Sequence, residues 1–215
     1  MNTDRLIDIL STNLEPVKGG KVWKTLAWAL VIGLAAAFVV MLATVGVRFD
    51  FDSETHRIFI ALKLLFTLSL IGTGAVFLIR SMRPGRGLRK LLPLVLVPFL
   101  VTGLAGIAAL LLAAARSESC TKMMMGMRWQ TCLLCIPLFA IIPFAALIWA
   151  LRHGAPTNLT RTGAIAGLVA GALGATAYAF HCGDDSLPFI AIWYGGSIAL
   201  CTFIGAMLGP KLLRW

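Results

Sequence analysis

The length leaves room for one modest domain, but the composition excludes a water-soluble globular protein. Of the 215 residues, 59% are hydrophobic and only 13% are charged, whereas soluble domains carry about 25% charged residues. The formal net charge of +10 comes from Lys and Arg residues that flank apolar segments, as in proteins that contact anionic lipid headgroups. No basic stretch is interleaved with aromatic residues, so we expect a lipid bilayer as a partner and no direct contact with nucleic acid.

The first 24 residues predict a short amphipathic helix. Thr3 suits the N-cap, and Pro16 ends the helical pattern. The apolar positions recur at helical spacing and are Leu6, Ile7, Leu10 and Leu14. Such a stripe either lies on a membrane surface or docks in the groove of a partner protein. Asp4 and Asp8 favour a protein partner, because membrane-surface helices are usually rich in Lys and Arg.

Six apolar segments follow, and each is long enough to cross about 30 Å of hydrocarbon as a helix. They lie near residues 25–47, 58–79, 91–115, 129–151, 163–180 and 187–213. The absence of alternation argues against strands, because only helices or closed barrels satisfy their backbone groups in lipid. The sequence therefore predicts an all-α integral membrane bundle of six transmembrane helices over residues 25–215, preceded by the amphipathic segment 1–24.

The distribution of Lys and Arg predicts the orientation of these segments. Most of these residues lie before the first segment, in the loops at 80–90 and 152–161, and after the last segment, which places them all on one side. Loops rich in Lys and Arg stay on the cytoplasmic side of a membrane. We therefore expect a multi-pass protein of the cell inner membrane, with both termini and the amphipathic helix in the cytoplasm.

This topology brings two of the five cysteines together. Cys132 begins the fourth segment at its outer end, and Cys182 follows the fifth segment at its outer end. Although they are far apart in the sequence, they reach one membrane face at similar depth. Cys135 lies one turn deeper than Cys132, Cys120 lies in an outer loop, and Cys201 is expected to be a small buried residue in mid-membrane.

Three kinds of chemistry fit an outward-facing thiol pair at Cys132 and Cys182. In an oxidising compartment the pair forms a structural disulfide. Alternatively, the thiols sense oxidants or bind a soft metal transiently, and the adjacent His181, Asp184 and Asp185 complete a coordination sphere or tune the acidity of the thiols. Redox catalysis is the weakest fit, because the Cys-x-x-Cys motif lies inside an apolar helix rather than beside a strand–helix unit.

Lys63 places a positive charge inside the second apolar segment. Its long side chain either extends to the membrane surface or pairs with a carboxylate on the same side. The candidate carboxylates are those of Asp50, Asp52 and Asp184.

Small residues form a stripe along the fifth segment, where Gly163, Gly167 and Gly171 recur every fourth position. Such a stripe lets the backbone of another helix approach closely. We expect this contact to form within the chain.

Two stretches resemble the NrsF-like family of membrane anti-sigma factors. The first is Thr3-Asp4-Arg5-Leu6-Ile7-Asp8-Ile9-Leu10 with the later Glu15-Pro16-Val17. The second extends over residues 129–194 and includes Cys132, Pro137, the block Arg152-His153-Gly154-Ala155-Pro156-Thr157, His181-Cys182-Gly183-Asp184-Asp185 and Trp193-Tyr194. The resemblance covers essentially the whole chain, including the six predicted spans.

The resemblance implies a function that the residues alone do not name. Members of this family hold an extracytoplasmic-function sigma factor at the membrane through cytoplasmic parts and release it under heavy-metal or oxidative stress. Two periplasmic cysteines sense the stress and correspond to Cys132 and Cys182, whereas Cys120 and Cys135 are not clearly part of the pattern. The implied protein is a regulator without a cofactor, not an enzyme, and we expect the stripe of the N-terminal helix to bind the sigma factor.

Two other classes stay open at this point. A metal-ion transporter or metal-uptake protein uses outer thiols for capture, but it needs polar groups deep in the bundle, and the spans offer few beyond Lys63. A disulfide-handling membrane enzyme needs a second redox pair, for which Cys120 and Cys135 are poorly placed.

Overall fold

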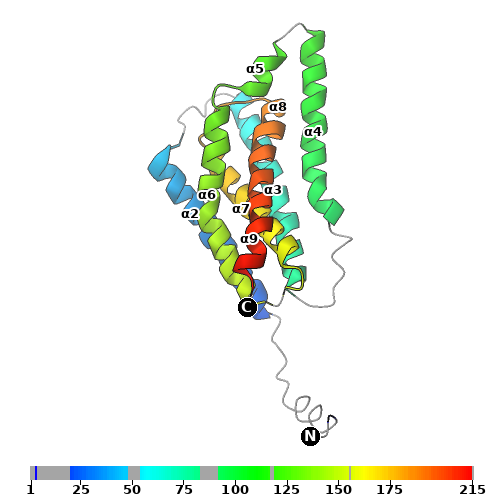
Figure 1. The fold of residues 1–215 in the computed structure, drawn as a ribbon. Helices are drawn as coiled ribbons and strands as arrows, with labels where there is room; N and C mark the ends of the chain where they lie inside the picture. Colours follow the sequence, from blue (N-terminus) through cyan, green and yellow to red (C-terminus); the bar gives the residue numbers. More distant parts are fainter. Residues whose placement is uncertain are drawn as a thin grey trace.

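The computed structural model of the protein describes residues 3, 20–47, 54–82, 92–116, 119–154 and 156–214. Across these ranges every regular element is a helix, which confirms the all-α prediction there, and the long helices run side by side (Figure 1). The elements are α2 (Gly20–Thr44), α3 (Glu54–Ser81), α4 (Leu92–Ala115), α5 (Cys120–Met125), α6 (Trp129–Arg152), α7 (Leu159–Tyr178), α8 (Leu187–Phe189), the π-helix η1 (Ile190–Tyr194) and α9 (Gly195–Leu212). The predicted apolar stripe of Leu6, Ile7, Leu10 and Leu14 lies outside the described residues.

Five helical stretches in the described ranges are long and apolar enough to cross a membrane. They are Trp23–Thr44, Glu54–Ser81, Pro93–Ala115, Cys120–Arg152 and Leu187–Leu212. The sequence predicted a sixth span at 163–180, where the structure has α7, and α7 is not among the five. The difference has a compositional reason, because α7 is built largely from Gly and Ala, which add little hydropathy.

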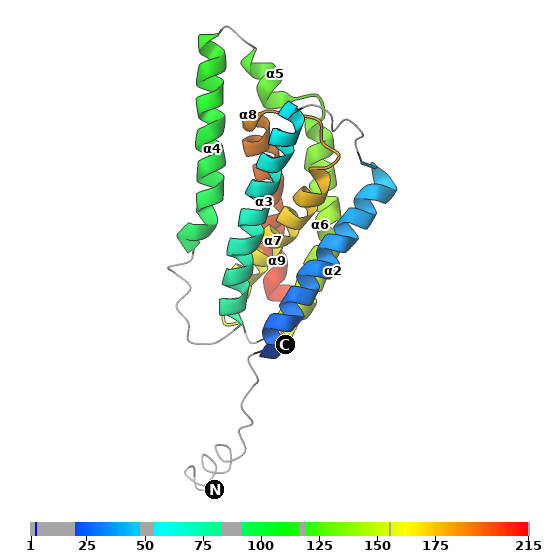
Figure 2. The same cartoon turned by 180° about the vertical axis from the view of Figure 1, so that it is seen from behind.

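The helix α7 is the centre of the bundle. Every residue from Ile165 to Ala179 is buried, and α7 packs most extensively on α9, then on α6 and α3. Figures 1 and 2 show α7 enclosed by its neighbours from both sides of the molecule. A helix that faces lipid usually carries larger apolar residues. Because α7 contacts protein around its whole circumference, it can consist of small residues instead.

The predicted glycine stripe forms the contact between α7 and α9. A Cβ atom on Gly163 would lie 2.4 Å from the carbonyl oxygen of Gly205, and a Cβ on Gly167 would lie 2.2 Å from that of Cys201. These distances leave no room for a side chain, so the two backbones pack directly against each other. The expectation of a close helix contact within the chain is confirmed, and Cys201 is buried at this contact as expected.

The helix α4 lies at the edge of the bundle. It packs against α3, α8 and η1, and it stands apart from the other long helices, with one end extending past them (Figure 2). Its exposed side chains are large and apolar, including Leu100, Leu104 and Leu111. A contiguous apolar surface of this kind is unusual in a soluble monomer and marks a contact with lipid or protein.

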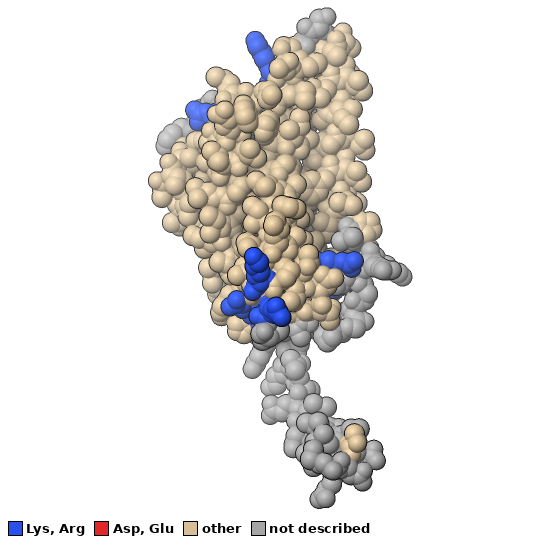
Figure 3. All heavy atoms as spheres, viewed as in Figure 1, with Lys and Arg blue, Asp and Glu red and all other residues tan. Residues whose placement is uncertain are grey.

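Within the described ranges, the exposed charged residues lie at the two ends of the bundle. On the face drawn in Figure 3, Lys and Arg lie towards the ends and the band between them carries none. At the end that holds the C-terminus, the exposed basic residues are Lys24, Arg80, Arg152, Arg161, Lys211 and Arg214. The acidic residues that the structure describes, Glu54, Asp184 and Asp185, all belong to the opposite end. One end is therefore strongly basic, and an uncharged band separates it from the other.

Candidate functional site

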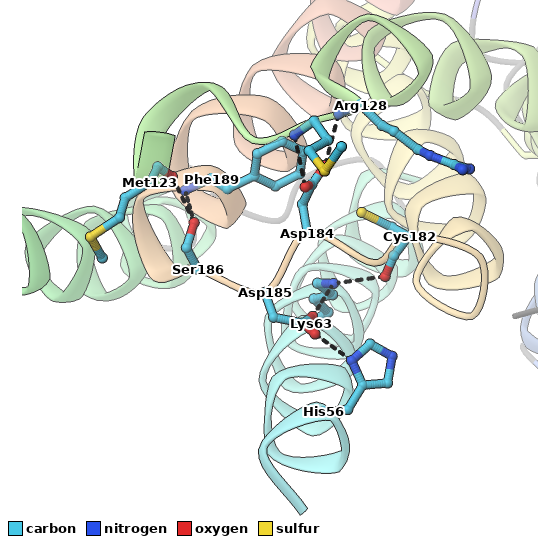
Figure 4. Close-up of polar contacts among 10 residues, drawn as sticks. His56, Lys63, Met123, Arg128, Cys182, Asp184, Asp185, Ser186 and Phe189 are labelled. Carbon is cyan, nitrogen blue, oxygen red and sulfur yellow. Dashed lines mark hydrogen bonds and ion pairs between the residues drawn. The ribbon is translucent and has the colours of Figure 1, made fainter. Parts of the chain in front are cut away.

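The connection between α7 and α8, residues 179–186, lies at the end of the bundle opposite the C-terminus and carries Cys182. Its side chains and backbone bind four other parts of the chain, which are the end of α2, α3, α5 and the turn that precedes α6. Figure 4 shows the contacts with α3, with α5 and with the turn that precedes α6. We call residues 181–186 the hub segment, and the two thiols of Cys132 and Cys182 the thiol pair.

The hub segment binds α3 through a buried charge. Lys63 is fully buried, and its ammonium group donates to the carboxylate of Asp185 over 3.0 Å and to the carbonyl oxygen of Cys182 over 3.1 Å (Figure 4). The other carboxylate oxygen of Asp185 contacts Nδ1 of His56, which lies two turns before Lys63 on α3. The ammonium also lies 5.9 Å from the ring centroid of Tyr194. A buried ammonium needs such partners, because its desolvation is costly.

These contacts correct the prediction for Lys63. The side chain does not extend to the surface, and its carboxylate partner is Asp185 rather than Asp184. The other predicted partners, Asp50 and Asp52, lie outside the described residues.

Asp184 binds the start of α6 instead. Its two carboxylate oxygens accept hydrogen bonds from the backbone N–H groups of Met127, at 2.9 Å, and Arg128, at 3.0 Å. The neighbouring Gly126 has a φ of +60°, and a Cβ there would lie 2.8 Å from the Asp184 carboxyl carbon and 2.7 Å from the ring of Phe189. The carboxylate thus satisfies donors that a helix start leaves free, and Gly126 provides the space and the left-handed backbone that this requires.

Ser186 and Trp193 hold α5 against the end of the bundle. The Ser186 hydroxyl donates to the carbonyl oxygen of Met123 over 2.7 Å, and Nε1 of Trp193 donates to that of Met124 over 2.9 Å. The indole rings of Trp193 and Trp129 are 4.7 Å apart. These bonds order the methionine-rich helix through its backbone.

His181 connects the hub segment to the end of α2. Its Nδ1 donates to the carbonyl oxygen of Gly46 over 3.1 Å, and its Nε2 is 3.4 Å from the guanidinium of Arg128. A cleft of about 420 Å³ opens here, lined by Val45, Val47, Met127, Arg128, His181, Gly183 and Asp184. The cleft is bordered by residues on both sides of Cys182 in the sequence.

The thiol pair lies together inside the protein. Cys132 is 0% exposed and Cys182 is 1% exposed, and both belong to one cluster of buried residues. No cysteine forms a disulfide, and all five cysteines are described. The topology argument correctly brings the two residues to one end of the bundle, but they are buried there rather than outward-facing.

Polar groups are buried in the same part of the bundle as the thiol pair. The hydroxyls of Tyr194 and Ser197 are buried and make no hydrogen bond among the described residues, and the Lys63 ammonium binds the carbonyl oxygen of Cys182. Burial raises the pKa of the Cys182 thiol, and the nearby Lys63 ammonium partly opposes that rise. The resting form of this thiol at neutral pH is therefore the protonated one.

The predicted auxiliary residues do not complete a metal site around the thiol pair. Among the described residues, no three His, Cys, Asp or Glu side chains are grouped so that they can hold a metal ion. His181, Asp184 and Asp185 each bind another element of the bundle.

Sequence reasoning missed His56, Tyr194, Ser197 and Gly126. Tyr194 and Ser197 lie one turn apart, at the junction of η1 and α9, and nothing in their spacing points to the thiols. The signal for His56 was available, because it shares a face of α3 with Lys63, seven residues later. A charge inside an apolar span calls for a polar neighbour on that face.

Comparison with known proteins gives the family. Residues 10–215 match the family profile described as NrsF, negative regulator of sigma F. The chain is 30% identical over 215 residues to the probable anti-sigma-F factor NrsF of Azospira oryzae, and 30% identical over 217 residues to the anti-sigma-F factor NrsF of Caulobacter vibrioides. Each alignment covers 100% of both chains. No solved structure matches the chain. The chain therefore belongs to the NrsF family of negative regulators and is a regulatory protein rather than an enzyme.

Proposed function

We propose that this protein is a membrane-bound anti-sigma factor that holds an extracytoplasmic-function sigma factor and releases it when the thiol pair reacts. The observation that carries the proposal is the full-length similarity to two relatives named as anti-sigma-F factors. The family profile, which extends over nearly the whole chain, supports the same reading.

The proposed location is the cell inner membrane. Five helices are long and apolar enough to span a membrane, and four of them, α2, α3, α6 and α9, pack on α7. In the proposed topology α7 crosses the bilayer as a sixth span enclosed by these helices. The basic end of the bundle supports a cytoplasmic position for both termini, because loops rich in Lys and Arg stay inside. The hub segment and the thiol pair then lie at the periplasmic end.

The proposed sigma-binding element is the N-terminal segment 1–24, through Leu6, Ile7, Leu10 and Leu14. Its apolar stripe fits the helix-in-groove mode of recognition. The basic end of the bundle lies beside the start of α2, so the segment would present its partner next to the cytoplasmic face.

The proposed signal is a soft metal ion or a two-electron oxidant at Cys132 and Cys182. A divalent soft metal binds both sulfur atoms and displaces two thiol protons. An oxidant instead takes two electrons and leaves a disulfide and two protons. Burial of the thiol pair supports a high threshold, since a protonated thiol is a poor nucleophile. His181, Asp184 and Asp185 assist by fixing the segment that carries Cys182.

The test is release of the sigma factor from the intact protein in lipid nanodiscs. The sigma factor is first identified by co-purification and mass spectrometry, and its affinity is then measured with and without Cd²⁺. We expect Cd²⁺ to weaken binding about tenfold, a typical coupling, in the wild type and in a Cys120→Ser control. The Cys132→Ser and Cys182→Ser variants should hold the sigma factor and not respond. Normal release from either variant would contradict the sensing role, and the absence of any bound sigma factor would contradict the proposal as a whole.

A further inference from the structure

We propose that Lys63 is a positioning residue that locks the sigma-holding state by tying Cys182 to α3, and that reaction of the thiol pair opens this lock. The inference rests on the proposed function and assigns a regulatory role to residues outside the thiol pair. It concerns Lys63, Asp185 and His56, which we call the α3 lock.

The α3 lock holds the hub segment at two points, Cys182 and Asp185, which are three positions apart in the sequence. The Lys63 ammonium binds the main-chain carbonyl of Cys182 and the side chain of Asp185. Its hydrogen bonds therefore depend on the backbone position of Cys182, the proposed sensing residue. Hydrogen bonds weaken steeply once the donor and acceptor separate beyond about 3.5 Å. A shift of the Cys182 backbone by a fraction of an ångström is therefore enough to weaken its bond to Lys63, which is 3.1 Å long.

Binding of a metal between the two sulfur atoms would produce such a shift. Sulfur–metal bonds in proteins are about 2.3 Å long for zinc, so two thiols that bind one ion must adopt a fixed separation and direction. Cys132 lies within the helix α6, where its backbone is held by the helical hydrogen bonds, whereas Cys182 lies outside regular structure. The adjustment therefore falls on Cys182, the residue whose carbonyl Lys63 holds.

Opening of the α3 lock would change the packing of α3. An ammonium buried to 0% exposure is not stable without its partners, so Lys63 must turn towards water or its helix must move. Below the lock, α3 packs along α7, where Thr176 donates to Thr67 over 3.0 Å and Val169 packs against Gly74. Gly74 has no space for a side chain there. Such a tight contact favours sliding of α3 as a unit over local repacking.

The helix α3 connects the two ends of the molecule. It begins at Glu54, beside the hub segment, and ends at Ser81, at the end of the bundle that holds the C-terminus (Figure 2). Displacement at Lys63 is thus carried along a single rigid element to the end where the sigma factor is proposed to bind. Contiguous packed elements of this kind transmit couplings of about 1–3 kcal/mol, which correspond to about 5- to 150-fold in affinity.

The experiment uses the full-length protein in nanodiscs with its sigma factor, and it measures two quantities. The first is binding of Cd²⁺, followed by the ultraviolet absorbance of cadmium–thiolate bonds. The second is the affinity for the sigma factor, with and without Cd²⁺. The test variant is Lys63→Met, which keeps the length of the side chain and removes the charge and the donor. The control is Thr67→Val, which removes a buried hydrogen bond one turn away on the same helix.

Loss of the lock should mimic the signal. We expect Lys63→Met to bind Cd²⁺ with the same stoichiometry as the wild type, to bind the sigma factor about tenfold more weakly without metal, and to respond to Cd²⁺ by less than about twofold. The Thr67→Val control should retain both the resting affinity and the response. The double variant Cys132→Ser/Lys63→Met should release the sigma factor as Lys63→Met does, because the lock acts after the thiols.

Other outcomes overturn the inference. If Lys63→Met has the resting affinity and the Cd²⁺ response of the wild type, the lock has no regulatory role. If Lys63→Met no longer binds Cd²⁺, Lys63 only shapes the thiol site. If Lys63→Met does not fold, Asp185→Asn decides. This variant keeps an oxygen acceptor but removes the carboxylate charge. We expect it to lower the affinity for the sigma factor, by a smaller factor than the tenfold expected for Lys63→Met. An unchanged affinity in Asp185→Asn overturns the inference.

Failure of the lock can be told apart from failure of the sensing role. If Cd²⁺ still releases the sigma factor from the Cys132→Ser variant, sensing by the thiol pair is wrong, and the proposal for the α3 lock is wrong as well. If Cys132→Ser does not respond to Cd²⁺ while Lys63→Met binds and releases the sigma factor as the wild type does, only the proposal for the α3 lock is wrong.

Discussion

The Asp185 carboxylate lies 3.0 Å from the fully buried ammonium of Lys63 and also contacts His56. Removal of one partner from a buried ion pair costs more than the pair contributes, because the remaining charge stays desolvated. Asp185 itself is 19% exposed, so water reaches one side of the pair.

We therefore expect Asp185→Ala to lower the free energy of unfolding by about 3 kcal/mol, the lower end of the range for buried pairs. The measurement is reversible denaturation in detergent micelles. The double variant Lys63→Met/Asp185→Leu should recover much of this loss, since it leaves no unpaired charge. Equal stability of Asp185→Ala and the wild type would show that the pair is solvated.

The α7–α9 contact predicts a large effect from a single methyl group. In Gly167→Ala the new Cβ would lie 2.2 Å from the backbone oxygen of Cys201, and backbone atoms cannot rotate away. We expect a loss of about 1–3 kcal/mol in the free energy of unfolding, as for other overpacked cores. Gly103→Ala is the matched control, because nothing lies within 4 Å of its Cβ. That variant should be neutral or slightly stabilising, as Ala favours helices, and a similar loss in both variants would count against the close contact.

Gly126 and Gly46 separate the cost of backbone strain from the cost of a steric clash. Both have positive φ, at +60° and +71°, so Ala is strained at either position by roughly 1–2 kcal/mol. Only at Gly126 does the added Cβ also meet Phe189 and Asp184. We expect Gly126→Ala to be the more destabilising of the two by about 1 kcal/mol or more, measured by thermal unfolding of both variants in the same detergent. Equal effects would indicate that Asp184 can move without loss.

Alkylation of Cys182 should depend on pH in a defined direction. Its pKa lies above the ordinary thiol value of 9.0, with burial as the main cause. The folded state thus favours the protonated thiol, and this contribution to stability is fully present below pH 9.0 and is lost as the pH rises towards the higher pKa of the folded state. In variants that retain one cysteine each, Cys182 should react with a maleimide far more slowly at pH 7 than the half-exposed Cys120 and should accelerate as the pH is raised. Fast labelling at pH 7 would contradict burial of this thiol.

Much of the architecture could be predicted because it depends on local composition. Long apolar runs define the helices, and the alternation of helix direction alone brings Cys132 and Cys182 to one end. The spacing of Gly163, Gly167 and Gly171 was sufficient to predict a close helix contact within the chain, although it did not identify α9 as the partner.

The errors arose where rotation of a helix or the path of a loop decides the outcome. Pairing of Lys63 with Asp185 rather than Asp184 depends on the directions in which these two adjacent side chains point. Asp184 instead accepts hydrogen bonds from the N–H groups of Met127 and Arg128. The thiol pair is buried in a cluster that also contains Tyr178, Tyr194 and Phe189, and no spacing rule connects these aromatic residues to cysteine.

The composition of α7 has a consequence for how the molecule is made. A segment built from Gly and Ala, with Arg161 in its first turn, gains little from lipid alone when it leaves the ribosome and meets the insertion machinery. Its stability comes from the neighbouring helices that enclose it, and α9 is synthesised after it. On the proposed topology, in which α7 is the sixth span, we expect α7 to remain beside α6 until α9 is synthesised, so that truncation of α9 would affect the insertion of α7 into the bilayer as well as its packing.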